Sequence, residues 1–410
     1  MNLLVKYEFL KIVRKKSTLM IMLVSLLITA FLFGLPVLQF QTYNQDGAVK
    51  GFEGIAYEKE QYKELPAELT DEYAAEAIKD VNKLFENPDN IGYDGHERFL
   101  IKDAYWNGIA PRENLLNIIA SVYALPGQSV GYNFLADLDP SDNLSFSEAR
   151  KTKIKTLLND SSRKLSDEQK EYWSDMNSHV VMPFQYGYHE GWKTIFTAFE
   201  LLIFAILAVC IVTAPVFSGE YQAGTDAVLL SGKFGKTKLI HAKIIASLLF
   251  GVIAFTVHII VALGIPLAAF GFEGFDLPVQ ILGMTIPYPF TILQAALVSL
   301  GVLYLILLAM IGLTLLLSSK MKTPYLVLVV LVPILFVPMF FTPTGTTGAY
   351  NLPLFLLPYR AATPEIGKYI SYQIGDLVMD TFSVRTILYA ALILITLPSA
   401  KLGFKKHQVS

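Results

Sequence analysis

The sequence predicts an all-α polytopic membrane protein with six transmembrane helices, and three observations support this prediction. Apolar residues make up 53% of the 410-residue chain and charged residues only 17%, which is too apolar for an ordinary soluble protein of this size. Several apolar runs exceed the roughly 18 residues that a spanning helix requires, and they carry almost no charge. Basic and acidic residues alternate between successive connecting segments, as expected of a multi-pass chain.

The apolar runs define the boundaries of the six expected helices. They cover residues 17–40, 194–217, 244–270, 290–318, 325–341 and 384–402. Pro333 and Pro338 fall within the fifth run. A proline removes one backbone donor and clashes with the preceding turn, so two of them predict a kink or a break there.

Residues 1–16 form a short, basic, loosely amphipathic segment ahead of the first span. Its cations are Lys6, Lys11, Arg14, Lys15 and Lys16. Such a segment can lie in the headgroup layer of the cytoplasmic face. The same lysines would also serve as a topology signal alone, and the sequence leaves both interpretations open.

Residues 41–193 change abruptly in composition and are expected to fold as a mostly helical extracellular domain. They hold 26 acidic and 16 basic residues, and an acidic excess after one span indicates an external location. Apolar residues recur at helical spacing over 73–85 and 115–122, which predicts two helices. Capping-box spacing predicts helix starts at three positions, Asp94, Ser145 and Ser166.

The remaining connections complete the expected layout. The polar link 218–243 carries four lysines against Glu220 and Asp226, so it is expected in the cytoplasm. Residues 342–383 contain apolar pieces too short to span, which fits an extracellular hairpin. The tail 403–410 is basic, so both termini are expected in the cytoplasm. Together with Lys401 at the end of the sixth run, the cytoplasmic segments hold 14 basic and 3 acidic residues.

The chain carries no recognisable machinery for catalysis. In the GKFGKT segment, Leu230 stands where a phosphate-binding loop needs its first glycine. No H-E-x-x-H motif is present, and the single cysteine, Cys210, excludes a disulfide framework. We expect no catalytic residue, no metal and no cofactor of the chain's own, so an intramembrane enzyme has little support. Any ATP would be bound by a partner subunit, and nothing points to nucleic acid.

Two ionisable residues lie within apolar runs, Glu200 in the second and His258 in the third. Charge at membrane depth is costly and usually faces a protein or water-filled interior, so both are candidate polar residues of a translocation path. The alternatives are a glutamate that reaches the outer surface and a neutral histidine bonded to a neighbouring carbonyl.

The segment between the second and third spans resembles the signature region of ABC-2-type permeases, the membrane subunits of one class of ABC exporters. The matching residues are an acidic residue, a Gly-Thr pair, a Leu-Leu-Ser run and two basic residues: Glu220, Gly224, Thr225, Leu229, Leu230, Ser231, Lys236 and Lys243. The family often has a proline and an arginine after the Leu-Leu-Ser run, where Gly232 and Lys236 stand here. Six spans with internal termini and an outer hairpin before the last span also resemble the family plan, here with an enlarged first extracellular domain.

The resemblance implies a permease that exports a peptide, drug or lipid-like molecule across the bacterial plasma membrane. Two permease chains, as a homo- or heterodimer in the lipid bilayer, would sit on two ABC ATPase subunits that hydrolyse the ATP. The residues of the signature region would couple the permease to the ATPase.

A second function, from another class, fits the same sequence. A membrane sensor or self-protection complex would bind an antimicrobial peptide through its extracellular domain without translocating it. An acidic domain would attract a cationic peptide over a distance. The alternative is that the outer domain is acidic only because it is soluble and lies outside the cell, and that it binds no peptide.

Overall fold

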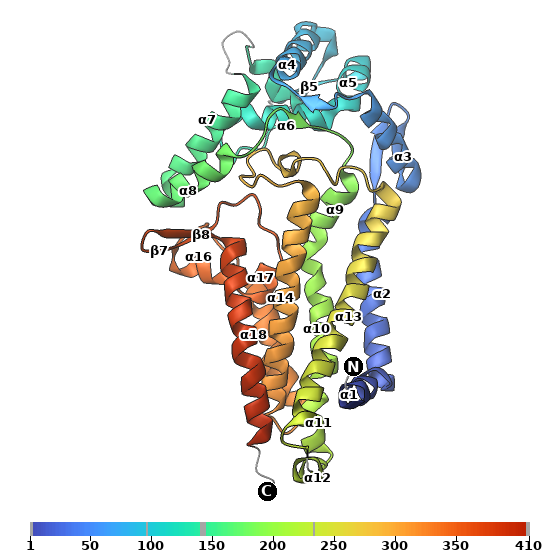
Figure 1. The fold of residues 1–410 in the computed structure, drawn as a ribbon. Helices are drawn as coiled ribbons and strands as arrows, with labels where there is room; N and C mark the ends of the chain where they lie inside the picture. The colour runs from blue at the N-terminus through green and yellow to red at the C-terminus, as the bar shows by residue number, and fades with distance from the viewer. Residues whose placement is uncertain (1–2, 96, 140–144, 233, 407–410) are drawn as a thin grey trace.

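The computed structural model describes residues 3–95, 97–139, 145–232 and 234–406, and most of them are helical. Long helices form a bundle, and a domain of shorter helices and hairpins covers one end of it (Figure 1). We call this domain, residues 41–189, the cap domain. The opposite end, where α1 (Leu3–Val13) and the last turns of the C-terminal helix lie, is called the basal end.

Five helices in the described ranges are long and apolar enough to cross a membrane. They are α2 (Lys16–Leu38), the run Glu190–Gln222, α13 (Lys238–Phe270), α14 (Ile292–Ser318) and α18 (Thr381–Lys405). At 1.5 Å per residue, each reaches across a hydrocarbon core of about 30 Å. Five of the six expected spans therefore correspond to such helices. The second, third and sixth extend several residues beyond their apolar runs, whereas α2 ends and α14 begins two residues inside theirs.

The run Glu190–Gln222 is divided into shorter pieces. These are α9 (Glu190–Ala198), a 3-10 turn at Phe199–Leu202, α10 (Ile203–Thr213) and α11 (Pro215–Gln222). Pro215 begins α11, where its missing N–H costs least. The break between α10 and α11 lies close to the basal end (Figure 1).

The fifth expected span is shorter than the others. It consists of α15 (Pro324–Phe336), followed by a 3-10 helix at Val337–Phe340. The α-helix ends just before Pro338, so the predicted break is confirmed. Between this element and α18 lie α16 (Gly348–Leu354), α17 (Pro358–Ala361) and a hairpin of β7 (Ser371–Ile374) and β8 (Leu377–Asp380).

The cap domain is mostly helical and has its own apolar core. Its helices are α3 (Gly51–Gln61), α4 (Asp71–Glu86), α5 (Lys102–Gly108), α6 (Glu113–Tyr123), α7 (Phe146–Asn159) and α8 (Asp167–Ser178). The predicted helices over 73–85 and 115–122 are confirmed as α4 and α6, whose buried residues, such as Val81 and Leu116, belong to one apolar core. Ser145 and Ser166 cap α7 and α8 as predicted.

The described chain also contains four two-stranded antiparallel sheets, which an all-α prediction does not include. In the cap domain these are β1 (Gln41–Asn44) with β2 (Gly47–Lys50), β3 (Glu68–Leu69) with β6 (Phe184–Gln185), and β4 (Ile91–Asp94) with β5 (Glu97–Leu100). The helix start predicted at Asp94 is wrong, because Asp94 ends β4. The Asp94–Gly95 pair is a hairpin signal, and apolar residues on both sides allow the strands to pair.

Polar contacts fasten the cap domain to the bundle. Arg150 of α7 is 3% exposed and donates from Nε to the carbonyl of Met284, 2.7 Å away, in the α13–α14 connection. Trp173 of α8 donates from Nε1 to the hydroxyl of Ser371 in β7 at 3.1 Å. The domain therefore packs on both of the other connections at its end of the bundle.

The outer surface of the bundle is itself apolar. Leu27 on α2 is 61% exposed and Leu394 on α18 is 75% exposed, within long exposed rows of similar side chains. Soluble monomers rarely expose large contiguous apolar patches, so this surface fits a lipid environment. The helices and this surface together indicate a multi-pass membrane protein.

Candidate functional site

Three helices bring opposite charges together at the basal end. Lys243 lies in the second turn of α13, Glu220 in α11 and Glu8 in α1. The ammonium of Lys243 contacts Glu8 at 2.9 Å and Glu220 at 2.8 Å, and its side chain is only 2% exposed. One buried cation therefore joins α1 to two helices that lie more than 200 residues later in the sequence.

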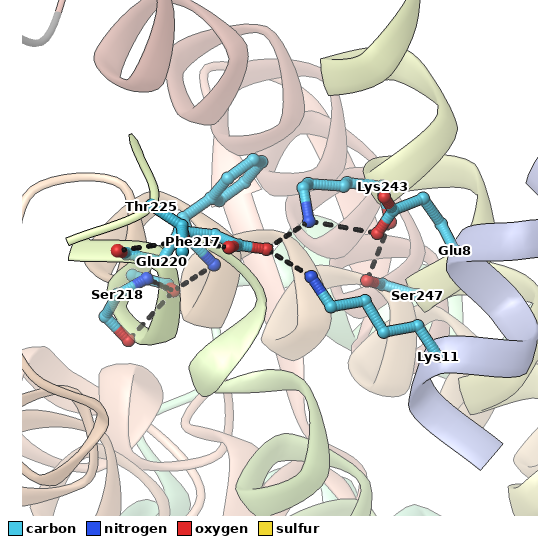
Figure 2. A network of polar contacts seen from close by, with 9 residues as sticks. Glu8, Lys11, Phe217, Ser218, Glu220, Thr225, Lys243 and Ser247 are labelled. Carbon is cyan, nitrogen blue, oxygen red and sulfur yellow. Dashed lines mark hydrogen bonds and ion pairs between the residues drawn. The ribbon is translucent and has the colours of Figure 1, made fainter. Parts of the chain in front are cut away.

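Two further groups satisfy the Glu220 carboxylate. Lys11 of α1 donates to Oε1 at 2.5 Å, and the Thr225 hydroxyl donates to Oε2 at 2.6 Å. Figure 2 shows both lysines pointing toward this carboxylate. We call Glu8, Lys11, Glu220, Thr225 and Lys243 the basal network. Its two cations and two anions balance, which is the condition under which buried charge is tolerated.

The break between α10 and α11 is held by a serine from another helix. Ser318, the last residue of α14, accepts the backbone N–H groups of Phe217 at 3.1 Å and Ser218 at 2.9 Å. Its hydroxyl donates to the Ala214 carbonyl at 2.6 Å. These bonds replace part of the helical ladder that Pro215 interrupts and tie α11 to the end of α14.

The link after α11 forms an exposed loop, residues 223–237, which we call the basal loop. It contains the short helix α12 (Asp226–Ser231) and lies beyond the ends of the long helices (Figure 1). Val228 is 74% exposed and Phe234 is 45% exposed, whereas Leu230 is buried against the bundle. An exposed aromatic side chain such as that of Phe234 is typical of a protein contact surface.

Two glycines fix the path of the basal loop. Gly224 has a φ of 64°, which only glycine adopts at little cost. A side chain at Gly235 would collide with the carbonyl of Leu229, so the return of the chain past α12 requires a glycine there.

The structure separates the signature residues into two groups. Glu220, Thr225 and Lys243 come together in the basal network, and Glu220 and Lys243 lie inside helices instead of in the link. The second group belongs to the basal loop: Gly224, Leu229, Leu230, Ser231 and Lys236. Ser231 and Lys236 are exposed and take no part in the network, and Lys233 lies outside the described residues.

Sequence reasoning missed three of the residues that complete this site. Glu8 is the only acidic residue within the first 16 positions, and that isolation was the available signal. Lys11 was counted only as surface charge. Nothing in the local sequence of Ser318 indicates its contact with α11, because the contact depends on how the helices pack.

The two candidate polar residues of a translocation path lie apart from the basal network. Glu200, in the 3-10 turn of the second span, accepts a hydrogen bond from Thr363 at 2.9 Å. His258 is 2% exposed, with Nδ1 2.8 Å from the Ala254 carbonyl and Nε2 3.0 Å from the Ser25 hydroxyl. His258 therefore links α13 to α2, and it shares no partner with Glu200 among the described residues.

Within the described residues there is no candidate metal site, and the GKFGKT segment does not follow a strand as a phosphate-binding loop does. Across the described ranges, no group of three or more His, Cys, Asp and Glu residues could hold a metal ion. Gly235 and Lys236 lie in the turn between α12 and α13, whereas a phosphate-binding loop follows a strand.

Comparison with known proteins places the chain in a family. The family model described as ABC-2 family transporter protein matches residues 2–376. No curated protein and no solved structure matches the chain. Because the match covers nearly the whole sequence, this chain belongs to the ABC-2 transporter family, whose members are the membrane subunits of ABC transporters.

Proposed function

We propose that the chain is an export permease whose basal loop docks, in the cytoplasm, on a separate ABC ATPase subunit. Membership of the ABC-2 family supports a permease of an ABC transporter. The direction of transport, the orientation in the membrane and the docking element are our own inferences from the geometry and the charge distribution.

One observation carries this proposal: the exposed basal loop is attached directly to the buried, charge-paired basal network. A partner that holds Val228 and Lys236 would contact the chain between α11 and α13. Both helices are bound to α1 through Lys243. Breaking a buried ion pair by removing one partner costs about 3–5 kcal/mol, so these helices would move together. A push on the loop would thereby become a rearrangement of packed helices.

The charge distribution supports a cytoplasmic basal end. The exposed basal residues include Lys6, Arg14, Lys236, Lys320 and Lys405, while the cap domain is acidic. Positive segments remain on the cytoplasmic side, which gives an extracellular cap domain and internal termini.

The connection between α14 and α18 supports a sixth crossing. Because α14 ends at the basal end and α18 begins near the cap domain, the chain must return between them (Figure 1). The 13 residues of α15 and the 4 residues of its 3-10 extension span about 27 Å at the usual rises. This nearly equals the hydrocarbon thickness, and a small mismatch is tolerated.

A functional transporter would contain two such permease chains and two ATPase subunits. A peptide, drug or lipid-like substrate would then move outward, powered by ATP hydrolysed in the partner subunit. Purification from cells that carry two differently tagged copies of this chain would distinguish a homodimer from a heterodimer, because the two tags copurify only in a homodimer.

Site-directed crosslinking tests the docking surface. The test uses Ser231→Cys in a Cys210→Ala background, with the ATPase whose gene neighbours that of the permease. We expect an ATP-sensitive crosslink at Ser231→Cys and loss of ATPase copurification in Lys236→Glu. Lys320→Glu, an exposed basic residue in the neighbouring basal turn, is the matched control and should copurify normally. Equal copurification by both charge reversals would refute docking through the basal loop.

One feature favours the alternative receptor function. A cavity of about 790 Å³ lies where the cap domain meets the bundle, lined in part by Asn117, Phe196 and Ile366. The Asn117 Oδ1 is buried and has no hydrogen-bond partner among the described residues, so a ligand could supply one. A receptor would bind an amphipathic peptide here, and Asn117→Leu would weaken the binding. ATP-dependent accumulation of that peptide inside inverted vesicles would instead support export.

A further inference from the structure

A second cavity, of about 480 Å³, lies beside the basal network. It is enclosed by α1, the first turns of α2 and the α10–α11 break. Lys11, Glu220 and Lys243 form one wall of it. The volume falls within the range of about 300–1,000 Å³ that is usual for ligand sites.

The lining of this cavity changes from polar to apolar with depth. Along α2 it passes from Ser17 and Thr18 to Ile21, and from α11 into α10 it passes from Glu220 to Val216 and Ile211. These two helices run in opposite directions, so both series lead from the basal end toward the middle of the bundle (Figure 1). A molecule that fits this gradient has a polar head at the membrane surface and an apolar tail directed into the bilayer.

The polar end of the cavity has an excess of positive charge. Three lysines (Lys11, Lys15 and Lys243) line it against two glutamates (Glu8 and Glu220), which leaves one positive charge over. Lys11 and Lys243 are paired with the glutamates, whereas Lys15 forms no ion pair within the described chain. Partial burial and the repulsion of Lys11 lower the pKa of Lys15, and a bound anion would relieve both effects.

The start of α2 adds hydrogen-bond donors at the same place. No side chain caps this helix, and its N-cap residue is Lys15. The first N–H groups of a helix and its dipole favour an anion. Independently, Thr18 is 4% exposed and lines the cavity, and its hydroxyl makes no hydrogen bond to any described residue. Because this hydroxyl has no partner among the described residues and its residue lines the cavity, it is available to bond a ligand group there.

We propose that this cavity binds an anionic glycerophospholipid, with its phosphate between Lys15, Thr18 and the start of α2. The first methylene groups of an acyl chain would cover Ile21 and Ile211. Inorganic phosphate shares the head chemistry but would leave the apolar end of the cavity uncovered. The bound lipid would hold α1 against α2 and α11, next to the basal network.

The test uses the full-length protein, stripped of lipid in a neutral detergent and titrated by calorimetry. The three probes are dihexanoyl phosphatidylglycerol, dihexanoyl phosphatidylcholine and inorganic phosphate. We expect phosphatidylglycerol to bind at least tenfold more tightly than either of the others. Lys15→Gln and Thr18→Val should each weaken its binding at least fivefold. Lys6→Gln is the matched control, because Lys6 is an exposed lysine of α1 that does not line the cavity, and its effect should stay within twofold.

Three results would overturn the proposal. Equal affinity of the wild type and Lys15→Gln for phosphatidylglycerol would show that Lys15 does not bind the phosphate. If inorganic phosphate binds as tightly as phosphatidylglycerol, the cavity is a site for a free anion. If phosphatidylcholine binds as tightly as phosphatidylglycerol, the cavity recognises only the apolar part of the lipid. Lys15 is exposed, so the Lys15→Gln chain should unfold at the wild-type temperature, which excludes misfolding as a cause. The assay contains no ATPase, so its failure would not bear on docking through the basal loop.

Discussion

The residue that holds the basal end together is Lys243. Its 2%-exposed ammonium lies between two carboxylates, and one of these also binds Lys11 and Thr225. Replacement of a whole buried ion network by apolar groups can be neutral, whereas removal of one member leaves charge without compensation. The cost of a substitution here therefore depends on which charges remain.

Lys243→Met should lower the free energy of unfolding by about 3–5 kcal/mol, because Glu8 and part of Glu220 lose their cation. Adding Glu220→Gln to this variant should recover part of the loss. Lys238→Met, an exposed lysine at the start of the same helix, is the control and should change stability by less than about 0.5 kcal/mol. Thermal unfolding in detergent measures all three, and equal losses for Lys243→Met and Lys238→Met would contradict the network.

Glu58 in the cap domain makes stability depend on pH. Burial, together with the charge of Glu190, raises the pKa of Glu58 to about 7 from 4.5, although Lys193 and Tyr188 oppose the shift. Between these values the folded chain binds more protons than the unfolded chain, so stability falls as pH rises from about 4.5 to 7. The total loss is at most about 3 kcal/mol.

Glu58→Gln should therefore stabilise the protein at pH 8 and leave it nearly unchanged at pH 5, because the amide carries no charge at either pH. Unfolding temperatures at both pH values measure the effect. Glu53→Gln, an exposed position on the same helix, should give the same small change at both. A Glu58→Gln effect that does not vary with pH would mean that the carboxyl is already ionised at pH 5.

At the scale of elements, apolar runs and prolines identified the long helices and the break in the fifth span. Local turn chemistry was less reliable: Asp94 has the spacing of a helix cap, yet it ends a strand because the neighbouring segments pair. The sequence also located the signature segment but did not predict its division between the buried basal network and the exposed basal loop. That division depends on Glu8 and Ser318, which only the packing of α1 and α14 brings to α11.

Ser318→Ala should destabilise the protein by about 1–3 kcal/mol, because it leaves the N–H groups of Phe217 and Ser218 without their acceptor. Ser319→Ala is a matched control, since among the described residues that buried hydroxyl bonds only to the Leu316 carbonyl, one turn earlier at the end of α14. Hydrogen exchange should show faster opening of α11 in Ser318→Ala alone. Equal exchange of α11 in the two variants would rule out the proposed clamp.

At the scale of the whole molecule, polar contacts concentrate at the two ends of the bundle. Near the cap domain, Arg150 and Trp173 join the domain to the other two connections. At the basal end, Lys243 and Ser318 join α1, α11, α13 and α14. The middle is mainly apolar packing with few polar links, such as His258 to Ser25. Such an arrangement lets helices tilt while their ends stay connected, which suits a protein that couples events on opposite sides of a membrane.

The orientation of the whole chain can be tested with single cysteines in a Cys210→Ala background, since Cys210 is buried and is the only cysteine. Val181 in the cap domain is 80% exposed, Leu377 in the β7–β8 hairpin is 59% exposed, and Lys236 is exposed in the basal loop. An impermeant maleimide should label Val181→Cys and Leu377→Cys in intact cells, because the proposed six crossings would put both outside. Lys236→Cys should react only after permeabilisation, because the positive charge of the basal end keeps it in the cytoplasm. Labelling of Lys236→Cys in intact cells would place the loop beyond the reach of any cytoplasmic ATPase and refute the proposed function.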